Sequence, residues 1–174
     1  MVVPLGTPKQ PEDLAGLLLD CHARIRHFLR VAVEVGARQD LSDPAVVDAC
    51  QRVERYFTQA LPLHVADEEE SLLPRLNGLD PELDRRLEAM RAEHETHDPL
   101  VAGLLAASGA TREAPADPAA RQALREAAER LTAALEPHLQ AEEAVVLPAV
   151  RARLSPAAQA EVISELRARR RPAG

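Results

Sequence analysis

Two segments of the sequence repeat one pattern of histidine, glutamate and proline. HVADEEESLLP begins at His64, and HLQAEEAVVLP begins at His138. In each segment a glutamate, Glu68 or Glu142, follows the histidine by four residues, and a proline stands at the same offset. Residues at i and i+4 lie one above the other on the same face of an α-helix. The pattern therefore predicts two helices that each present an imidazole and a carboxylate side by side.

Leucine and valine residues flank both His–Glu pairs, which places the pairs at or next to a buried stripe. One such pair alone is typical of a solvated surface, but the second copy favours a shared role. An ionised carboxylate in an apolar interior is strongly disfavoured unless it is paired or bound to metal. His22 and His94 precede His64 and His138 by similar intervals, so each half of the chain supplies an equivalent set. We therefore predict a centre of two metal ions, with imidazoles as terminal ligands and the two glutamates as bridges.

Composition and capping residues predict the elements that position these side chains. Alanine, leucine, glutamate and arginine are strong helix formers, and only 2% of the residues are aromatic, which argues against strands. Helix starts are expected near Pro11 and wherever a capping residue precedes a proline: Asp43-Pro44, Asp80-Pro81, Asp117-Pro118 and Ser155-Pro156. Helix ends are expected at Gly36, at Asn77-Gly78 and at SGATREAPAD, residues 108–117.

These signals predict an all-α protein, an up-down-up-down four-helix bundle with a short C-terminal fifth helix. The expected helices cover about 11–37, 44–76, 81–107, 118–153 and 156–170. The whole chain, 1–174, is expected to form a single domain, with the bundle at about 11–153 and the accessory helix at about 156–170.

Charge and cysteine content narrow the classes of function. A net charge of −7 argues against nucleic-acid binding, which needs a basic surface. The RARRR run at 167–171 is interpreted as a solvated helix end in preference to an anion-binding tail. Cys21 and Cys50 form no CxxC pair, no signal peptide is visible, and no apolar run is long enough to span a membrane. A cytoplasmic location without a membrane partner is therefore expected.

Four stretches of the chain together resemble the hemerythrin-like proteins, also called the hemerythrin HHE cation-binding family. The resemblance covers about residues 14 to 150 and is carried by CHARIRHFL, HVADEEESLLP, EHETHDPLVAGL and HLQAEEAVVLP. It implies a hemerythrin-like domain with a non-haem di-iron centre, bridged by two carboxylates and open to dioxygen or another small ligand. It also implies a set of ligands: His22, His64, Glu68, His94, His138 and Glu142.

The chain departs from the family pattern at two places. The oxygen-carrying members have HxxxH on the third helix, whereas here His97 follows His94 by three residues and Asp98 takes the fourth place. His97 is included among the expected ligands, with Asp98 as the alternative. Those members also place the last carboxylate five residues after its histidine, which here is Glu143, but the internal repeat favours Glu142.

Several neighbouring residues have two interpretations. Asp67, Glu69 and Glu143 are either outer partners of the ligands or part of a solvated acidic face. Prolines within the helices, at Pro62, Pro99 and Pro137, either improve packing or widen the bundle around the metals. Tyr56 is expected to fill the core in preference to facing the site, and His27 is expected at the surface or as an outer partner of the ligands.

A histidine-rich site favours reversible ligand binding, while carboxylate-rich di-iron sites more often activate dioxygen. We expect a di-iron protein that binds dioxygen, nitric oxide or peroxide for sensing, storage or stress response. The first alternative is a di-iron oxidase or peroxide-degrading enzyme that acts on a small molecule. The second alternative, ranked last, is a metal-responsive interaction module. The ligand types also suit manganese or zinc, and the sequence leaves open whether the site is catalytic and which oligomer forms.

Overall fold

The computed structural model describes residues 13–171, and all of the secondary structure in this part of the chain is helical. The all-α class is confirmed. The described residues contain α-helices and three π-helical segments, labelled η: α1 Leu14–Ala37, α2 Asp43–Arg55, η1 Tyr56–Ala60, α3 Leu61–Ala66, η2 Asp67–Leu72, α4 Leu73–Leu76, α5 Pro81–Glu113, α6 Pro118–Ala141, η3 Glu142–Val146, α7 Leu147–Arg153 and α8 Pro156–Arg169.

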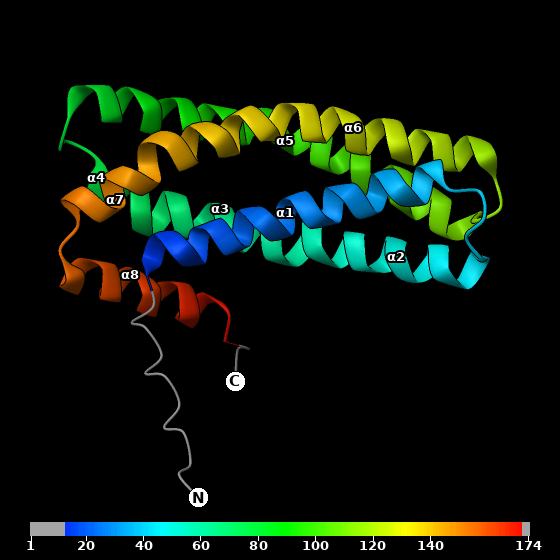
Figure 1. Cartoon of the computed structure of the whole chain (residues 1–174), viewed down its shortest axis with the longest axis horizontal. Helices are drawn as coiled ribbons and strands as arrows, with labels where there is room; N and C mark the ends of the chain where they lie inside the picture. Colours follow the sequence, from blue (N-terminus) through cyan, green and yellow to red (C-terminus); the bar gives the residue numbers. More distant parts are fainter. Residues whose placement is uncertain (1–12, 172–174) are drawn as a thin grey trace, which may run out of the picture.

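Four long helical runs lie side by side: α1, α2 to α4, α5, and α6 to α7 (Figure 1). Helix α1 packs against α2 and α6, and α5 packs against the same two neighbours. Helix α8 packs across η2 and the beginning of α1 (Figure 1). The up-down-up-down order and the single-domain boundaries stay predictions. No helix in the described part of the chain is long and apolar enough to cross a membrane.

Most of the predicted helix starts coincide with the observed caps. The carboxylates of Asp80 and Asp117 and the hydroxyl of Ser155 accept hydrogen bonds from backbone amides at the starts of α5, α6 and α8. Asp43 does not cap α2, because Ser42 holds the cap position and Asp43 is already helical. The start expected near Pro11 lies outside the described residues. Within the described residues, Asp13 caps α1.

Helix α5 continues past the end predicted at residue 107 and reaches Glu113. Contacts with neighbouring helices hold the extra turns. Ser108 Oγ lies 3.2 Å from a carboxylate oxygen of Glu54, and Thr111 Oγ1 lies 3.0 Å from the carbonyl oxygen of Ala120. These tertiary contacts outweigh the weak helix propensity of Gly109.

The basic run at 167–171 lies at the end of α8, and Arg167, Arg170 and Arg171 are exposed, as expected of a solvated helix end, but the run also makes ion pairs that were not predicted. Arg169 Nη1 and Arg170 Nη2 lie 3.1 Å and 2.5 Å from the two carboxylate oxygens of Asp67, whose side chain is fully buried. Arg169 also contacts Glu70 at 3.1 Å. Ion pairs therefore hold the end of α8 against η2, the segment that contains Glu68.

The buried apolar residues form two cores, one toward each end of the bundle. One core runs from Ile25 to Leu61 and from Leu104 to Leu139 along the chain. The other uses residues 14–18, 72–90 and 146–166. In the first three helical runs the histidines and glutamates expected to bind metal fall between the stretches that supply the two cores; in the fourth run Glu142 does so, and His138 lies among the last residues of the first core. The fold therefore places a polar layer between two apolar layers.

At Gly36 the backbone of α1 lies close against α6, which gives a test of this packing. A Cβ atom at Gly36 would lie 2.6 Å from the carbonyl oxygen of Arg121 and 2.6 Å from Cβ of Arg125. We expect Gly36→Ala to lower the free energy of unfolding by about 1–3 kcal/mol, because backbone must move. Gly103 has nothing within 4 Å of such a Cβ, so Gly103→Ala should raise stability by about 0.5–1 kcal/mol. Urea titrations of both variants measure the contrast, and equal effects would contradict the close approach.

Candidate metal centre

Six of the seven side chains expected to bind metal lie together in two groups. His22, His64, Glu68 and Glu142 form one group, and Glu68, His94 and His138 form the other. Within each group the candidate ligand atoms all lie within 4.8 Å of one another, and every member is buried. Glu68 belongs to both groups, which is the arrangement that a carboxylate bridging two ions requires.

The first group brings α1, α3 and the two inner glutamates together. Nε2 of His22 lies 3.1 Å from Oε2 of Glu142, and Nε2 of His64 lies 3.0 Å from Oε1 of Glu68. The two imidazole rings meet edge to face, with their centroids 5.3 Å apart. Two histidines from different helices therefore face two carboxylates that are fully buried.

The second group joins α5 and α6 to the same glutamate. Nε2 of His94 lies 3.2 Å from Oε2 of Glu68, the oxygen that does not contact His64. The rings of His94 and His138 lie 4.9 Å apart between centroids. The two oxygens of Glu68 thus point toward histidines of different groups.

The buried atoms at the centre are short of hydrogen-bond partners. Within the described part of the chain, no hydrogen-bond partner is found for Nε2 of His22, Nε2 of His94 or the carboxylate oxygens of Glu68 and Glu142, although the pairs above are close. Their contacts therefore lack hydrogen-bond geometry. Leaving such groups unsatisfied in the interior costs about 1–3 kcal/mol each, and more for charged groups. Imidazole nitrogens and carboxylate oxygens that converge in this way fit divalent first-row metals such as iron, manganese and zinc.

Two π-helical segments carry the inner glutamates, Glu68 in η2 and Glu142 in η3. Each of the three π segments ends at a leucine whose N–H donates to the carbonyl five residues back, and a proline follows: Leu61 to Tyr56, Leu73 to Glu68 and Leu147 to Glu142. Proline lacks an N–H and its ring clashes with the carbonyl four residues back, and single π turns concentrate at functional sites. The repeated Leu-Pro pair was the signal in the sequence, but a kink was predicted at only one of the three pairs, at Pro62.

Outer carboxylates hold the second ring nitrogen of three of the histidines. Nδ1 of His22 lies 2.9 Å from Glu143, and Nδ1 of His94 lies 2.7 Å from Glu69. In both motifs, therefore, the first of two consecutive glutamates faces Nε2 of a histidine from another helix, and the second faces Nδ1 of the same ring. An acceptor at Nδ1 fixes the tautomer that leaves Nε2 free to bind a metal.

The third outer carboxylate, Glu93, was missed by the sequence analysis. Its Oε2 lies 2.6 Å from Nδ1 of His138, and Arg86 holds the same carboxylate at 2.8 Å. Glu93 precedes His94 in the sequence but serves a histidine of the neighbouring helix. No spacing within one helix reveals such a contact.

The alternatives left open by the sequence separate clearly in space. Glu142 lies in the first group, while Glu143 contacts His22 Nδ1 and Arg26 outside it. His97 is in neither group; it is buried, and its ring meets that of His138 edge to face with centroids 5.2 Å apart. Asp98 is exposed.

Other residues of uncertain role also take definite places. Asp67 points away from the centre to Arg169 and Arg170. His27 is exposed and meets the ring of Phe28. Tyr56 is buried and stacks on Phe28, with ring centroids 4.4 Å apart, and its hydroxyl donates to the carbonyl of Cys21 at 3.4 Å.

Charges within the centre shift its protonation in the metal-free chain. Burial lowers the pKa of His64, but Glu68, Cys21 and Glu142 together raise it by more, so that the pKa lies well above its ordinary value. Burial also lowers the pKa values of His22 and His94. The carboxylates of Glu142, beside His22, and of Glu68, beside His94, act in the opposite direction, and both pKa values are raised. For Glu68 burial is overcome by His64, and the pKa of the carboxyl is lowered well below its usual range. The metal-free centre therefore holds protons that a metal ion must displace.

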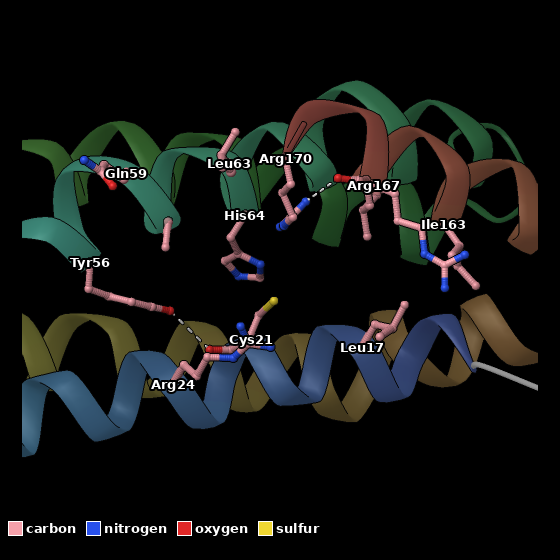
Figure 2. A pocket seen from close by; sticks show the side chains of 12 residues that line it. Leu17, Cys21, Arg24, Tyr56, Gln59, Leu63, His64, Ile163, Arg167 and Arg170 are labelled. Atoms are coloured by element: carbon pink, nitrogen blue, oxygen red, sulfur yellow. Dashed lines mark hydrogen bonds between the residues drawn. The ribbon is translucent and has the colours of Figure 1, made fainter. Parts of the chain in front are cut away.

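Two cavities reach the centre. The smaller, of about 40 Å³, lies among Ile25, Leu61, Val101 and the rings of His64, His94, His97 and His138. The larger, of about 450 Å³, lies between α1, η1, α3 and α8 and also adjoins His64 (Figure 2). The small cavity has room for a diatomic molecule, since a water molecule takes roughly 30 Å³ in the liquid.

Glu93 gives a test of the outer carboxylates. We expect Glu93→Gln to weaken metal binding roughly 10- to 100-fold, because the acceptor that orients His138 loses its charge. Competition against a chelator of known affinity measures the effect. Glu95→Gln, at an exposed position of the same helix, is the matched control and should bind as the unaltered chain does. Equal metal affinities of the two variants would show that Glu93 does not support metal binding.

Comparison with known proteins agrees with this geometry. A family model for the hemerythrin HHE cation binding domain matches residues 13–120. The matched part contains His22, His64, Glu68, His94 and His97, and it ends before His138 and Glu142. A search of curated proteins found no match.

Proposed function

Because the chain belongs to the hemerythrin HHE cation-binding domain family, we propose that its His/Glu centre holds two iron ions and binds dioxygen or a related small ligand. The metal-binding character of the site is supported by the family and by the two residue groups. Under the proposal, His22 and His64 with Glu142 hold one ion, His94 and His138 hold the other, and Glu68 bridges them. His97 is proposed as a further ligand or as a neighbour of the bound small molecule.

One observation supports the proposal most directly, the set of buried atoms without hydrogen-bond partners around Glu68. Both oxygens of Glu68 and both of Glu142 are buried and unsatisfied, next to imidazole nitrogens in the same state. A core that kept these groups without cations would be costly. Two bound cations would satisfy the carboxylates and the nitrogens together.

The small cavity supports binding of a diatomic ligand. It adjoins His94, His97 and His138, and its other walls are mainly leucine, isoleucine and valine. When bound, iron would supply the electrons for reversible dioxygen binding, while the apolar walls would exclude water from the ligand. His97 lines this cavity without belonging to either metal group, so it is placed to contact the small ligand.

The test is elemental analysis paired with absorption spectroscopy. Protein purified without added metal should contain iron, close to two ions per chain when saturated. In air it should develop ligand-to-metal charge-transfer bands that disappear on deoxygenation and return on reoxygenation. A spectrum that stays unchanged at full iron occupancy would reject dioxygen binding, and the absence of iron would reject the proposed metal.

The second candidate is an enzyme, and the larger cavity favours it. A volume of about 450 Å³ exceeds what dioxygen requires and lies in the range of small-molecule sites. The candidate reaction is oxidation of a small organic molecule or breakdown of peroxide. Steady consumption of hydrogen peroxide, or of an organic substrate with dioxygen, by the iron-loaded protein distinguishes it from a carrier, which reacts once per site.

A further inference from the structure

The larger cavity has a lining that carries positive charge, whereas the chain as a whole is acidic. Its walls come from α1, from η1 and α3, and from α8, and Figure 2 shows side chains from all three directions turned toward it. Helix α8 contributes Ile163, Leu166, Arg167 and Arg170. The accessory helix therefore closes a site as well as packing against the bundle.

Charge is distributed unevenly around this cavity. The chain has a net charge of −7, yet among the described residues Arg24, Arg167 and Arg170 line the cavity and no aspartate or glutamate does. Arg170 also pairs with Asp67, which lies outside the lining, and Nε of Arg24 donates to the carbonyl of Asp20 at 3.3 Å. A guanidinium presents five N–H donors in a planar fork, which suits a carboxylate. The potential in the cavity therefore favours an anion.

The remaining walls are apolar or carry single polar groups. Leu17, Leu63, Ile163 and Leu166 form the apolar surface, and the Tyr56 and Gln59 side chains are also part of the lining. Small-molecule sites are typically 300–1,000 Å³, mostly apolar, with a few polar groups that fix orientation. A cavity of about 450 Å³ accommodates an apolar body as well as an acidic head.

His64 connects this cavity to the centre, and it differs there from the other three histidines. Nδ1 of His22, His94 and His138 each has a glutamate partner, whereas Nδ1 of His64 has no hydrogen-bond partner. Cys21 lies beside the His64 ring on the cavity side (Figure 2). A molecule in the cavity therefore lies against the one of these four imidazoles whose Nδ1 no carboxylate holds.

We propose that the cavity between α1, α3 and α8 binds a small amphiphilic carboxylic acid, with its carboxylate at the arginines and its apolar body on the leucine and isoleucine side chains. The site goes beyond the proposed metal centre and does not depend on metal occupancy. A bound acid adjoins His64, so it is in a position to act as the organic substrate or as an effector of that centre.

The single tyrosine of the chain provides the measurement. The sequence contains one Tyr and no Trp, and Tyr56 lines the cavity, so tyrosine fluorescence reports on this site alone. Octanoate, below the concentration at which it forms micelles, should change the fluorescence of the full-length protein saturably, with or without metal. Octylammonium, which has the same chain and the opposite charge, should give no saturable change. Calorimetry on both probes checks the result independently.

A matched pair of variants tests the role of charge. Arg24→Gln should weaken octanoate binding about tenfold, because one charge-assisted hydrogen bond is lost. Arg130→Gln, at an exposed position on α6 outside the lining, should bind as the unaltered chain does. No saturable binding of octanoate, equal binding of octylammonium, or equal affinities of the two variants would each overturn the proposal. Because these assays are done on the metal-free protein as well, failure of the proposed iron chemistry leaves their outcome readable.

Discussion

We expect Glu68→Gln to reduce the metal content from about two ions per chain to one or fewer. Oε1 of Glu68 lies 3.0 Å from Nε2 of His64, and Oε2 lies 3.2 Å from Nε2 of His94. The two oxygens therefore serve different groups, so when one oxygen becomes an amide nitrogen one group loses its oxygen ligand, the other keeps a neutral oxygen, and the bridge between the groups is lost. Glutamine keeps the size of the side chain but has one acceptor and no charge. Elemental analysis after dialysis against buffer of known free metal measures the loss.

Two further variants show whether this effect is specific to the bridging position. Glu142 occurs only in the first group, so Glu142→Gln should leave the second group able to bind one ion. Glu70→Gln, two residues from Glu68 on the outer face, changes a contact to Arg169 and should retain both ions. A Glu68→Gln protein that holds two ions with unaltered affinity would contradict the shared position of Glu68.

Local signals were enough to predict the helices because they act within one turn of the chain. Asp80, Asp117 and Ser155 cap their helices through contacts two or three residues along. The late end of α5 was not predictable in this way, since Ser108 and Thr111 make contacts with α2 and α6. The pairing of Arg169 and Arg170 with Asp67 was missed for the same reason, as the partners are about a hundred residues apart.

The same difference between local and tertiary contacts determines which residues of the metal centre could be predicted. The internal repeat identified Glu68 and Glu142, because each is fixed relative to a histidine on its own helix. It also favoured Glu142 over Glu143, and the structure places Glu142 within the first group. The partners at Nδ1 come from other helices, so Glu93 was not found and Glu69 and Glu143 were left undecided. Periodicity places His94 and His97 on one face of α5, and only tertiary packing sets His97 apart from the groups.

We expect the stabilisation by metal to grow steeply as the pH rises from about 5 to about 8. The pKa values of His22, His64 and His94 are raised in the metal-free fold, because nearby carboxylates outweigh burial. A histidine whose folded pKa lies above its unfolded value stabilises the metal-free fold fully below the unfolded pKa, about 6.5. That contribution is lost as the pH rises through the folded pKa. The metal-free chain should thus lose this stabilisation toward alkaline pH, where the neutral imidazoles become available to the metal.

Thermal unfolding with and without iron, across this range of pH, measures both trends together. A metal present at a thousand times its dissociation constant stabilises the fold by about 4 kcal/mol, and the gain should shrink at acid pH as protons compete. His94→Gln removes one titrating ligand and should flatten the pH dependence as well as reduce the gain. A shift in melting temperature that is independent of pH would mean that the ions bind away from these histidines. The polar layer between the two apolar cores would then have to be stabilised by protons alone. The metal-free chain would be most stable at a pH at which His22, His64 and His94 are charged.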